Sequence, residues 1–560
     1  MKAKRTAVMA AGAAIALLTV SACGGSSDSS GGSDNNGAVL AQTAWAKASY
    51  DDVKQGGTLV QSIGQLPDNY NYNQLNGALG DLATIQYPIT SYTGTKFRED
   101  GQWEIDKDYI LSAKLVSKAP EKIDVKLNPK AVWSDGTPIT AADMISFWKA
   151  MRGTDKAFEV VATNGYQDME NIEQGASQFE YTITYKKVNA DWPNYMYPAL
   201  PKSVSSSPDA FNKGFVKKQY PSNGPFVISN IDQNAQVVTE TPNPKWWGRK
   251  PKLDKLIFRV VDQNALGQAF ANKEIDVLDT QANADTQAQA KKRADVKIQR
   301  SGGITWTHLT MNAKKPPFDN VNVRKGVAEA IDRETMAQVV QKGLGVKPVT
   351  QGSAIYVPGQ KGYQDNESKI LPYSTKKAEA DFKAAGYKKG SDGVYAKDGK
   401  PLSFSITVPS DTATNAQRAQ LIQGFLKKVG VTVRLETVPV AKYFVDYVSP
   451  LNFQAVTFSW QGTGFPVSST ESLFYPVKSG QNYTGQGDAA LGDLWDKANA
   501  ELDPAKQTAL ANDIDKKIYE LGAIVTIAPT PTIYAVKNGI VNIGASQFQT
   551  PDYTQVGYKK

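Results

Sequence analysis

The sequence predicts an α/β protein with more than one core, and its length, its composition and a strand–helix–strand pattern support that prediction. The chain has 560 residues, 41% of them hydrophobic and 21% charged, which is ordinary for a globular protein and enough for two or three cores. Strand patterns at Leu402–Val408 and Val431–Val438 flank a helical stretch. This βαβ pattern is typical of a parallel sheet with helices packed on it.

The first third of the chain predicts strands that end at turns. Gly56–Ile63 is a glycine-led strand pattern, and Ala131–Trp133 is a shorter one that runs into Ser134–Pro138. The Asp-Gly and Thr-Pro pairs of that last segment turn the chain. Thr140 then has the position of a helix N-cap, and Asp143, three residues on, completes a capping box, so we expect a helix to begin there.

Two further helices are predicted by apolar spacing and by a stop signal. After Pro316-Pro317, apolar residues recur at i, i+4, i+7 and i+8, which places one face of a helix against the core; they are Val323, Val327, Ala330 and Ile331. The helical stretch from Lys377 ends at Gly386, which suits the left-handed conformation of a C-cap.

The amino terminus has the composition of a secretory signal peptide. Lys2, Lys4 and Arg5 precede an uncharged, mostly apolar run, Thr6–Val20, and small residues follow it. The run is too short to span a bilayer comfortably. Residues 1–22 are therefore assigned to a signal peptide that export removes.

Cys23 is the single cysteine of the chain and ends Val20–Cys23, a segment that resembles a bacterial lipobox. The resemblance implies that Cys23 becomes a lipidated first residue, which anchors the protein at the extracellular face of the cell membrane. A soluble secreted protein whose cysteine happens to lie there is the alternative. Gly24–Gly37 has little apolar surface and much backbone freedom, so residues 23–55 are expected to form a flexible linker.

Composition argues against several classes of function. The net charge is +8, and no basic run is interleaved with aromatic residues, so nucleic-acid binding has little support. One cysteine and one histidine cannot build a disulfide, a zinc site or a cysteine–histidine metal site. His308 lies in a strand pattern, Ile304–Met311, and no Gly-x-Ser-x-Gly turn is present, which argues against a serine hydrolase. We therefore expect no catalytic residue, metal or cofactor.

The segment Trp133–Asp143 resembles the hallmark of the family 5 solute-binding proteins, which bind oligopeptides, dipeptides and nickel chelates. Further segments resemble the family in the same order: Asn223–Phe226, Asn243–Gly248, Pro251–Asp254, Glu274–Val277, Met311–Asn312, Pro316–Asp319, Val323–Gly326, Ala330–Arg333, Lys377–Tyr387, Phe453–Trp460 and Gln481–Gly485. The resemblance covers essentially all of the chain from Gly56 to about Val536. It implies the binding protein of an ABC importer and not an enzyme.

The resemblance also implies the fold and its divisions. Members of this family have two α/β lobes of the type II periplasmic-binding-protein-like fold, with an extra subdomain inserted in the first lobe. The lobes are hinged at two chain crossings and enclose the ligand; here the crossings fall near Ile304 and Ala528. Lobe I then comprises residues 56–87, 221–304 and 529–560, the inserted subdomain comprises 88–220, and lobe II comprises 305–528.

A peptide is the cargo that the resemblance favours, so the expected partners are a peptide and the permease subunits of an ABC transporter. An extended peptide can add a strand to an exposed strand edge, a mode indifferent to side-chain identity. Val456–Trp460 resembles the family strand that supplies this edge, and Trp460 either packs on a ligand side chain or belongs to the core. The residues expected at the ligand are Tyr87, Ile89, Tyr92, Ser459, Trp460, Gln461, Gly462 and Thr463. A monomer is expected, because each molecule presents both lobes to one transporter.

The sequence departs from the family at one position. Peptide-binding members resemble Trp-x-x-Asp at this strand, where the aspartate pairs with the α-ammonium group of the ligand. In this chain Thr463 stands there, and a hydroxyl group cannot neutralise a charge. Either another carboxylate such as Glu471 replaces the aspartate, or the ligand is longer, blocked or not a peptide.

Other functions are compatible with the sequence. The same fold accepts a sugar, a siderophore or a nickel chelate, and aromatic faces serve sugars as well as peptides. Capture could also report extracellular peptides for signalling at the same site. From a different class, the 55 acidic residues could include the carboxylate pair of a glycosidase, which needs no histidine.

Overall fold

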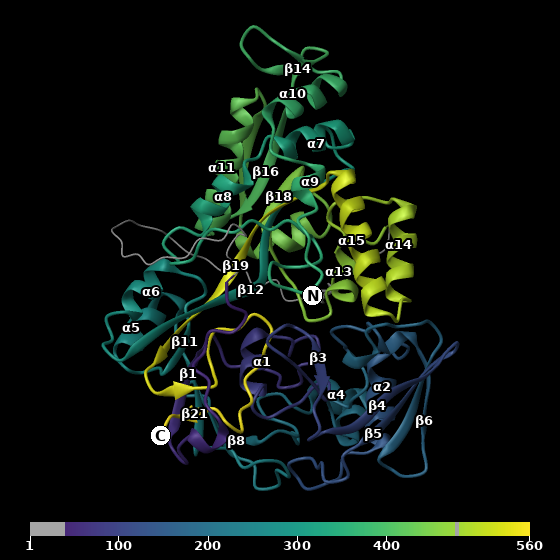
Figure 1. Cartoon of the computed structure of the whole chain (residues 1–560), viewed down its shortest axis with the longest axis vertical. Coiled ribbons are helices and arrows are strands. Elements are labelled where there is room, and N and C mark those ends of the chain that lie inside the picture. The colour runs from purple at the N-terminus through teal and green to yellow at the C-terminus, as the bar shows by residue number, and fades with distance from the viewer. Residues whose placement is uncertain (1–39, 411, 477–480) are drawn as a thin grey trace, which may run out of the picture.

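The computed structural model describes residues 40–410, 412–476 and 481–560 (Figure 1). The predicted signal peptide and Cys23 lie outside these residues. No helix within the described ranges is long and apolar enough to cross a membrane.

A ten-stranded sheet connects the two halves of the molecule, and its two longest strands belong to both (Figure 1). These strands, β12 (Val296–Met311) and β19 (Ile524–Lys537), pair antiparallel, from Val296 opposite Lys537 to Thr310 opposite Ile524. Beyond β12 lie, in order, β18 (Ala455–Gln461), β16 (Ser403–Pro409) and β17 (Thr432–Val438). Beyond β19 lie β11 (Val277–Asp279), β1 (Thr58–Ile63), β10 (Lys255–Val260), β9 (Val237–Pro242) and β8 (Phe226–Asp232).

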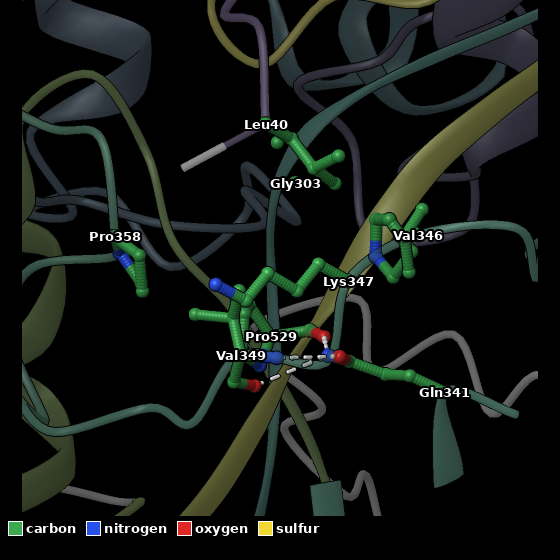
Figure 2. A pocket seen from close by; sticks show the side chains of 10 residues that line it. Leu40, Gly303, Gln341, Val346, Lys347, Val349, Pro358 and Pro529 are labelled. Atoms are coloured by element: carbon green, nitrogen blue, oxygen red, sulfur yellow. Dashed lines mark hydrogen bonds between the residues drawn. The ribbon is translucent and has the colours of Figure 1, made fainter. Parts of the chain in front are cut away.

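The pairing of β12 with β19 is interrupted between Ser301 and Thr305, where the chain passes from one half to the other. A Cβ atom on Gly303 would lie 1.8 Å from the Thr530 carbonyl oxygen, so only glycine allows this approach. Figure 2 shows a pocket at this place, lined by Leu40, Gly302, Gly303, Gln341, Val346, Lys347, Val349, Pro358, Pro529 and Pro531. Since both crossing strands contribute to its walls, the pocket marks the hinge.

The half beyond β12 has the largest core and contains several of the predicted elements. β16, α11 (Ala413–Lys428) and β17 form the predicted βαβ unit, with Ser403 and Thr432 paired in parallel. Further helices of this half are α7 (Val321–Glu329), α8 (Arg333–Val340), α9 (Glu367–Ile370), α10 (Thr375–Ala384), α12 (Val440–Lys442) with the π-helix Tyr443–Val448 after it, α13 (Pro466–Phe474), α14 (Ala489–Asn499) and α15 (Pro504–Leu521). The four apolar residues predicted on one helix face are buried, but α7 ends at Glu329, so only Val323 and Val327 lie on the helix, and Ala330 and Ile331 follow it. Gly386 follows α10 with a φ of 91°, which confirms the predicted left-handed C-cap.

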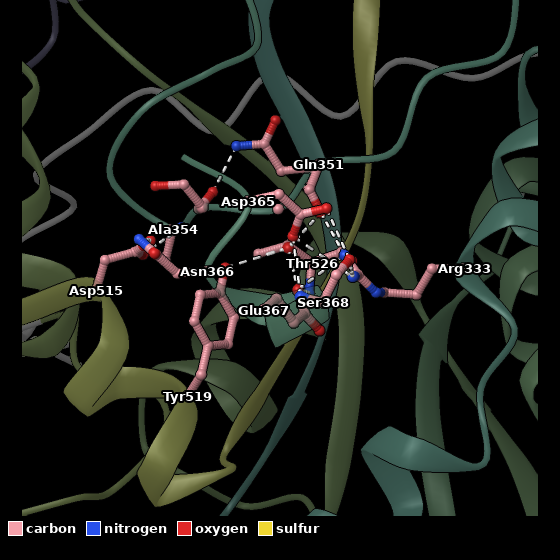
Figure 3. A network of polar contacts seen from close by, with 12 residues as sticks. Arg333, Gln351, Ala354, Asp365, Asn366, Glu367, Ser368, Asp515, Tyr519 and Thr526 are labelled. Carbon is pink, nitrogen blue, oxygen red and sulfur yellow. Dashed lines mark hydrogen bonds and ion pairs between the residues drawn. The ribbon is translucent and has the colours of Figure 1, made fainter. Parts of the chain in front are cut away.

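A buried polar network ties these helices to the long strand β19 (Figure 3). The Arg333 guanidinium group donates to the Gln351 carbonyl (2.6 Å), to the Glu367 carboxylate (3.2 Å) and to the Ser368 hydroxyl (2.6 Å). The same Glu367 carboxylate accepts the backbone N–H of Thr526 at 3.0 Å. A buried charged group that lost its partner would cost several kcal/mol, about 3–5. The network therefore links α8 and α9 to β19.

Residues between α1 (Gly80–Gln86) and β8 form a separate layer with its own sheet, in the order β4 (Ile110–Lys118), β5 (Glu121–Leu127), β7 (Glu180–Tyr185), β6 (Met169–Gln174). The other elements of this layer are β2 (Thr95–Phe97), β3 (Trp103–Ile105), α2 (Ala141–Met151), α3 (Lys202–Ser205) and α4 (Pro208–Lys213). The predicted capping box is confirmed at the start of α2: Asp143 accepts the backbone N–H and the hydroxyl of Thr140 at 2.8 and 2.9 Å.

The structure corrects the expected linker. Residues 23–55 were expected to be flexible, but the described part, 40–55, packs against the carboxyl-terminal segment. Trp45 and Val53 are buried, the Ala44 N–H donates to the Ala545 carbonyl at 2.9 Å, and Val53 forms an isolated bridge with Lys559. The Gly/Ser composition that predicted flexibility ends at Gly37, before these packed residues.

Candidate ligand-binding site

The strand β18 positions the aromatic candidate Trp460. Its antiparallel pairing with β12 sets Trp460 opposite Trp306 and Phe458 opposite His308, so that these rings share one face of the sheet. The Trp460 ring lies 5.9 Å from His308 and 5.7 Å from the Tyr483 ring, with interplanar angles of 11° and 12°. Trp460 is only partly buried. Its ring packs on the core around Phe458 and Tyr483, and part of it remains accessible to solvent.

One edge of β18 is open. Its pairing with β16 is confined to Ala455 and Val456, whereas its pairing with β12 continues to Gln461. From Thr457 onward, no strand in the described part of the chain pairs with the edge that faces away from β12. The backbone of Ser459 and Gln461 on this side is therefore available to an added strand.

His308 has the structural role that its strand pattern predicts. The ring is fully buried, its Nδ1 lies 3.0 Å from the Thr310 hydroxyl, and its Nε2 has no partner among the described residues. Burial, and then the charge of Arg418, hold the pKa of His308 well below its usual value. The imidazole is therefore neutral at physiological pH.

The Thr463 side chain forms hydrogen bonds with residues close to it in the sequence. Its hydroxyl accepts the N–H of Phe465 and donates to the Ser469 hydroxyl, both at 3.0 Å, in the turn before α13. The backbone that leads into this turn is held beside β12, because the Gly462 N–H donates to the Ile304 carbonyl at 2.7 Å. Glu471, named as a replacement for the missing aspartate, accepts from Asn499 at 2.8 Å, and burial raises its pKa.

Of the candidates in the other half, only Tyr87 is widely accessible. It follows α1 with 49% of its surface exposed, yet burial raises the pKa of its phenol, and Tyr72 adds to the effect. The phenol of Tyr87 is thus accessible to solvent and still flanked by protein groups. Tyr92 donates to the Gln86 side chain and packs on Tyr72 at 5.4 Å.

The structure does not place Ile89 at an accessible surface. Its side chain is fully buried in the core around β1, and its carbonyl accepts the N–H groups of Asn223 and Gly224 at 3.1 and 2.7 Å. The prediction that the Ile89 side chain contacts the ligand is therefore wrong. The prediction failed because the apolar side chain of Ile89 is needed by the core.

A set of contacts joins the inserted layer to the half that carries β18, and we call it the closing contact. Its residues are Phe97, Lys187, Ala190 and Asp191 on the inserted layer and Gly464, Phe465, Ser468, Asp496 and Asn499 on the other side. The Phe97 and Phe465 rings lie 5.5 Å apart, edge to face, and the Ala190 N–H donates to the Asn499 carbonyl at 2.9 Å. Lys187 and Asp496 form an ion pair at 3.4 Å.

The closing contact borders the open edge of β18, because Gly464 and Phe465 follow it directly. No sequence pattern points to Phe97 or Asp191, because their partners Phe465 and Ser468 lie far along the chain. Within the described ranges, no group of three or more histidine, cysteine, aspartate or glutamate side chains could hold a metal ion.

Known proteins resemble this chain over nearly its whole length. The oligopeptide-binding protein OppA of Mycobacterium tuberculosis is 32% identical over 552 residues, 98% of this chain and 92% of that protein. A periplasmic EDTA-binding protein, EppA, superimposes with a TM-score of 0.82 at 24% identity, covering 94% of this chain and 100% of that one. AppA of Bacillus subtilis, solved with a nonapeptide, gives a TM-score of 0.71 at 21% identity over 91% of this chain and all of that one.

These likenesses confirm the expected fold, in which two hinged α/β lobes carry an inserted subdomain. The model of the bacterial extracellular solute-binding proteins, family 5, matches residues 109–485. This match covers more than half of the chain, and the chain therefore belongs to that family.

Proposed function

We propose that this protein captures peptides, most readily oligopeptides, outside the cell and delivers them to an ABC importer. The open edge of β18 carries the proposal, because it offers backbone donors and acceptors beside the partly buried Trp460. An extended peptide can pair with that edge whatever its side chains are. The 32% identity with an oligopeptide-binding protein over 98% of the chain supports the same function.

Closure around the peptide follows from the hinge. A ligand shifts the balance between open and closed forms only by its greater affinity for the closed form. A peptide paired with β18 and touching Tyr87 would bond to both halves at once. We divide the chain accordingly into lobe I (56–87, 221–304 and 529–560), the inserted subdomain (88–220) and lobe II (305–528).

The experiment is to purify the mature protein natively, release its ligand under denaturing conditions and identify it by mass spectrometry. We expect a mixture of peptides. Calorimetry with a random-sequence peptide mixture on the emptied protein should then show binding. A sugar, a siderophore or a metal chelate in the released fraction, with no binding of peptides, would overturn the proposal.

We also propose that the protein works as a lipid-anchored monomer at the extracellular face of the membrane and has no catalytic activity. The position of the single cysteine, Cys23, after a signal-peptide pattern supports the anchor. Mass spectrometry of the mature amino terminus should find acylated Cys23, and light scattering should find one chain per particle. A free, unacylated amino terminus would contradict the anchor.

A further inference from the structure

The last residue of β11, Asp279, has a carboxylate with no cation beside it. Its Oδ1 accepts the N–H of Gln281 at 2.8 Å, and the side chain is exposed. Among the described residues, no lysine, arginine or histidine forms an ion pair with it. A carboxylate with one backbone bond keeps most of its acceptor positions free.

Asp279 lies at the end of its strand that points toward the hinge. β11 pairs antiparallel with β19, Asp279 standing opposite Tyr534, and β19 continues from Tyr534 to Thr530 at the crossing (Figure 1). Residues directly opposite on an antiparallel pair share a face of the sheet. Asp279 and Tyr534 are therefore neighbours on the lobe I side of the hinge.

Tyr534 interacts electrostatically with both Asp279 and Tyr87. Burial raises the pKa of the Tyr534 phenol, and Asp279, Tyr553 and Tyr87 raise it further, so these groups lie within electrostatic reach of one another. Burial also raises the pKa of Asp279 to about 6, against the lowering effect of the Gln281 N–H. Asp279 thus has an exposed side chain whose charged form the surrounding protein disfavours, and Tyr87 combines exposure with desolvation in the same way.

An exposed anion without an ion pair in the described chain, at the end of β11 that points toward the crossing, favours a cation from the ligand, and their interaction strengthens where water is scarce. Thr463 supplies no charge, and Glu471 is engaged by Asn499. We propose that Asp279 is the carboxylate that pairs with an ammonium group of the ligand, either its free amino terminus or a lysine side chain. This inference rests on the proposed capture of peptides and names the cation-binding residue of that site.

The test compares the wild-type protein with Asp279→Asn, which keeps an oxygen for the Gln281 N–H and removes the charge. The matched control is Asp262→Asn, because Asp262 is also exposed in lobe I and accepts the N–H two residues on, that of Asn264, at 2.8 Å. Asp262→Asn should keep the wild-type melting temperature, and Asp279→Asn should melt at or above it, because removing a carboxylate whose pKa burial raises does not cost stability at neutral pH.

Calorimetry would use four random-sequence peptide mixtures: free or N-acetylated, each with lysine or with norleucine in its place. We expect Asp279→Asn to weaken binding about tenfold for mixtures that carry the recognised ammonium group and to leave the doubly neutral mixture unchanged. If Asp279→Asn no longer weakens binding once the peptides are acetylated, the recognised ammonium group is the amino terminus. If it no longer weakens binding once norleucine replaces lysine, the recognised group is the lysine side chain. Asp262→Asn should bind all four as the wild type does.

Two outcomes would overturn the inference, and they are distinguishable. If the wild type binds the mixtures and Asp279→Asn binds them equally well, Asp279 does not recognise the ligand, while peptide capture stands. If the wild type binds none of the four mixtures, peptide capture fails and the role of Asp279 fails with it.

Discussion

Glu121, the first residue of β5, has a buried carboxyl group with incomplete hydrogen bonding. Only 1% of the residue is exposed, its Oε2 accepts the Asn189 N–H at 2.7 Å, and its Oε1 has no partner among the described residues. Burial raises the pKa of this carboxyl from 4.5 to about 7, although the Asn189 N–H opposes the shift. Since the folded pKa exceeds the unfolded one, the stability linked to Glu121 is complete below about pH 4.5 and is lost as the pH rises through 7.

Replacing Glu121 by Gln removes the ionisation and keeps an oxygen for Asn189. We expect Glu121→Gln to raise the free energy of unfolding above pH 7 by about 2–3 kcal/mol and to change it little near pH 4. Urea unfolding followed by circular dichroism across this range measures both values. A gain of equal size at both pH values would show that the carboxyl group does not titrate as described.

At the scale of secondary-structure elements, the sequence predicts what depends on neighbours along the chain. The capping box of Thr140, the buried face of α7 and the glycine after α10 are local patterns, and the structure confirms them. Asp279 could not be found in this way, because its strand partner Tyr534 lies on the returning chain. The prediction for Ile89 failed for a related reason, because its burial depends on core residues from several distant strands.

The link between β18 and α13 passes close to the inserted subdomain at Gly464. A Cβ atom added there would lie 2.1 Å from the Phe97 ring. We expect Gly464→Ala to force the closing contact apart and to weaken ligand binding about tenfold, because overpacking costs about 1–3 kcal/mol. Calorimetry with the released natural ligand measures the change.

Two variants test whether the Phe97 ring is the cause. The double variant Gly464→Ala, Phe97→Ala should recover part of the lost affinity, since the two positions are in contact. Gly424→Ala is the matched control, because a Cβ atom there meets nothing within 4 Å, and it should bind as the wild type does. Failure of Phe97→Ala to rescue would locate the strain elsewhere.

At the scale of the whole molecule, two structural features govern closure. The crossing at Gly303 is the proposed hinge between the halves, and the buried network around Arg333 ties α8 and α9 to β19 in the half beyond β12. The closing contact joins protein groups only, so it stabilises the closed state whether or not a ligand is bound. Ligand affinity therefore depends on contacts that no ligand touches, because the free energy of closing contributes to the overall free energy of binding.

Asp191 is the buried charged residue of the closing contact. Burial raises the pKa of its carboxyl, while hydrogen bonds from the Ser468 side chain and backbone N–H lower it. We expect Asp191→Ala to weaken the closed state and to reduce affinity about tenfold for all ligands alike, because charge-assisted bonds contribute about 1.5–3 kcal/mol. Calorimetry with two dissimilar peptides measures the factor, and small-angle scattering should show a more open empty protein.

The ion pair beside it provides the control. Lys187 and Asp496 have side chains that are 58% and 47% exposed, and exposed pairs contribute at most about 1 kcal/mol. Lys187→Ala should therefore change both affinities less than about fivefold. An effect of Asp191→Ala on one peptide alone would mean that Asp191 contacts that ligand directly, and the closing contact would then not set the population of the closed state.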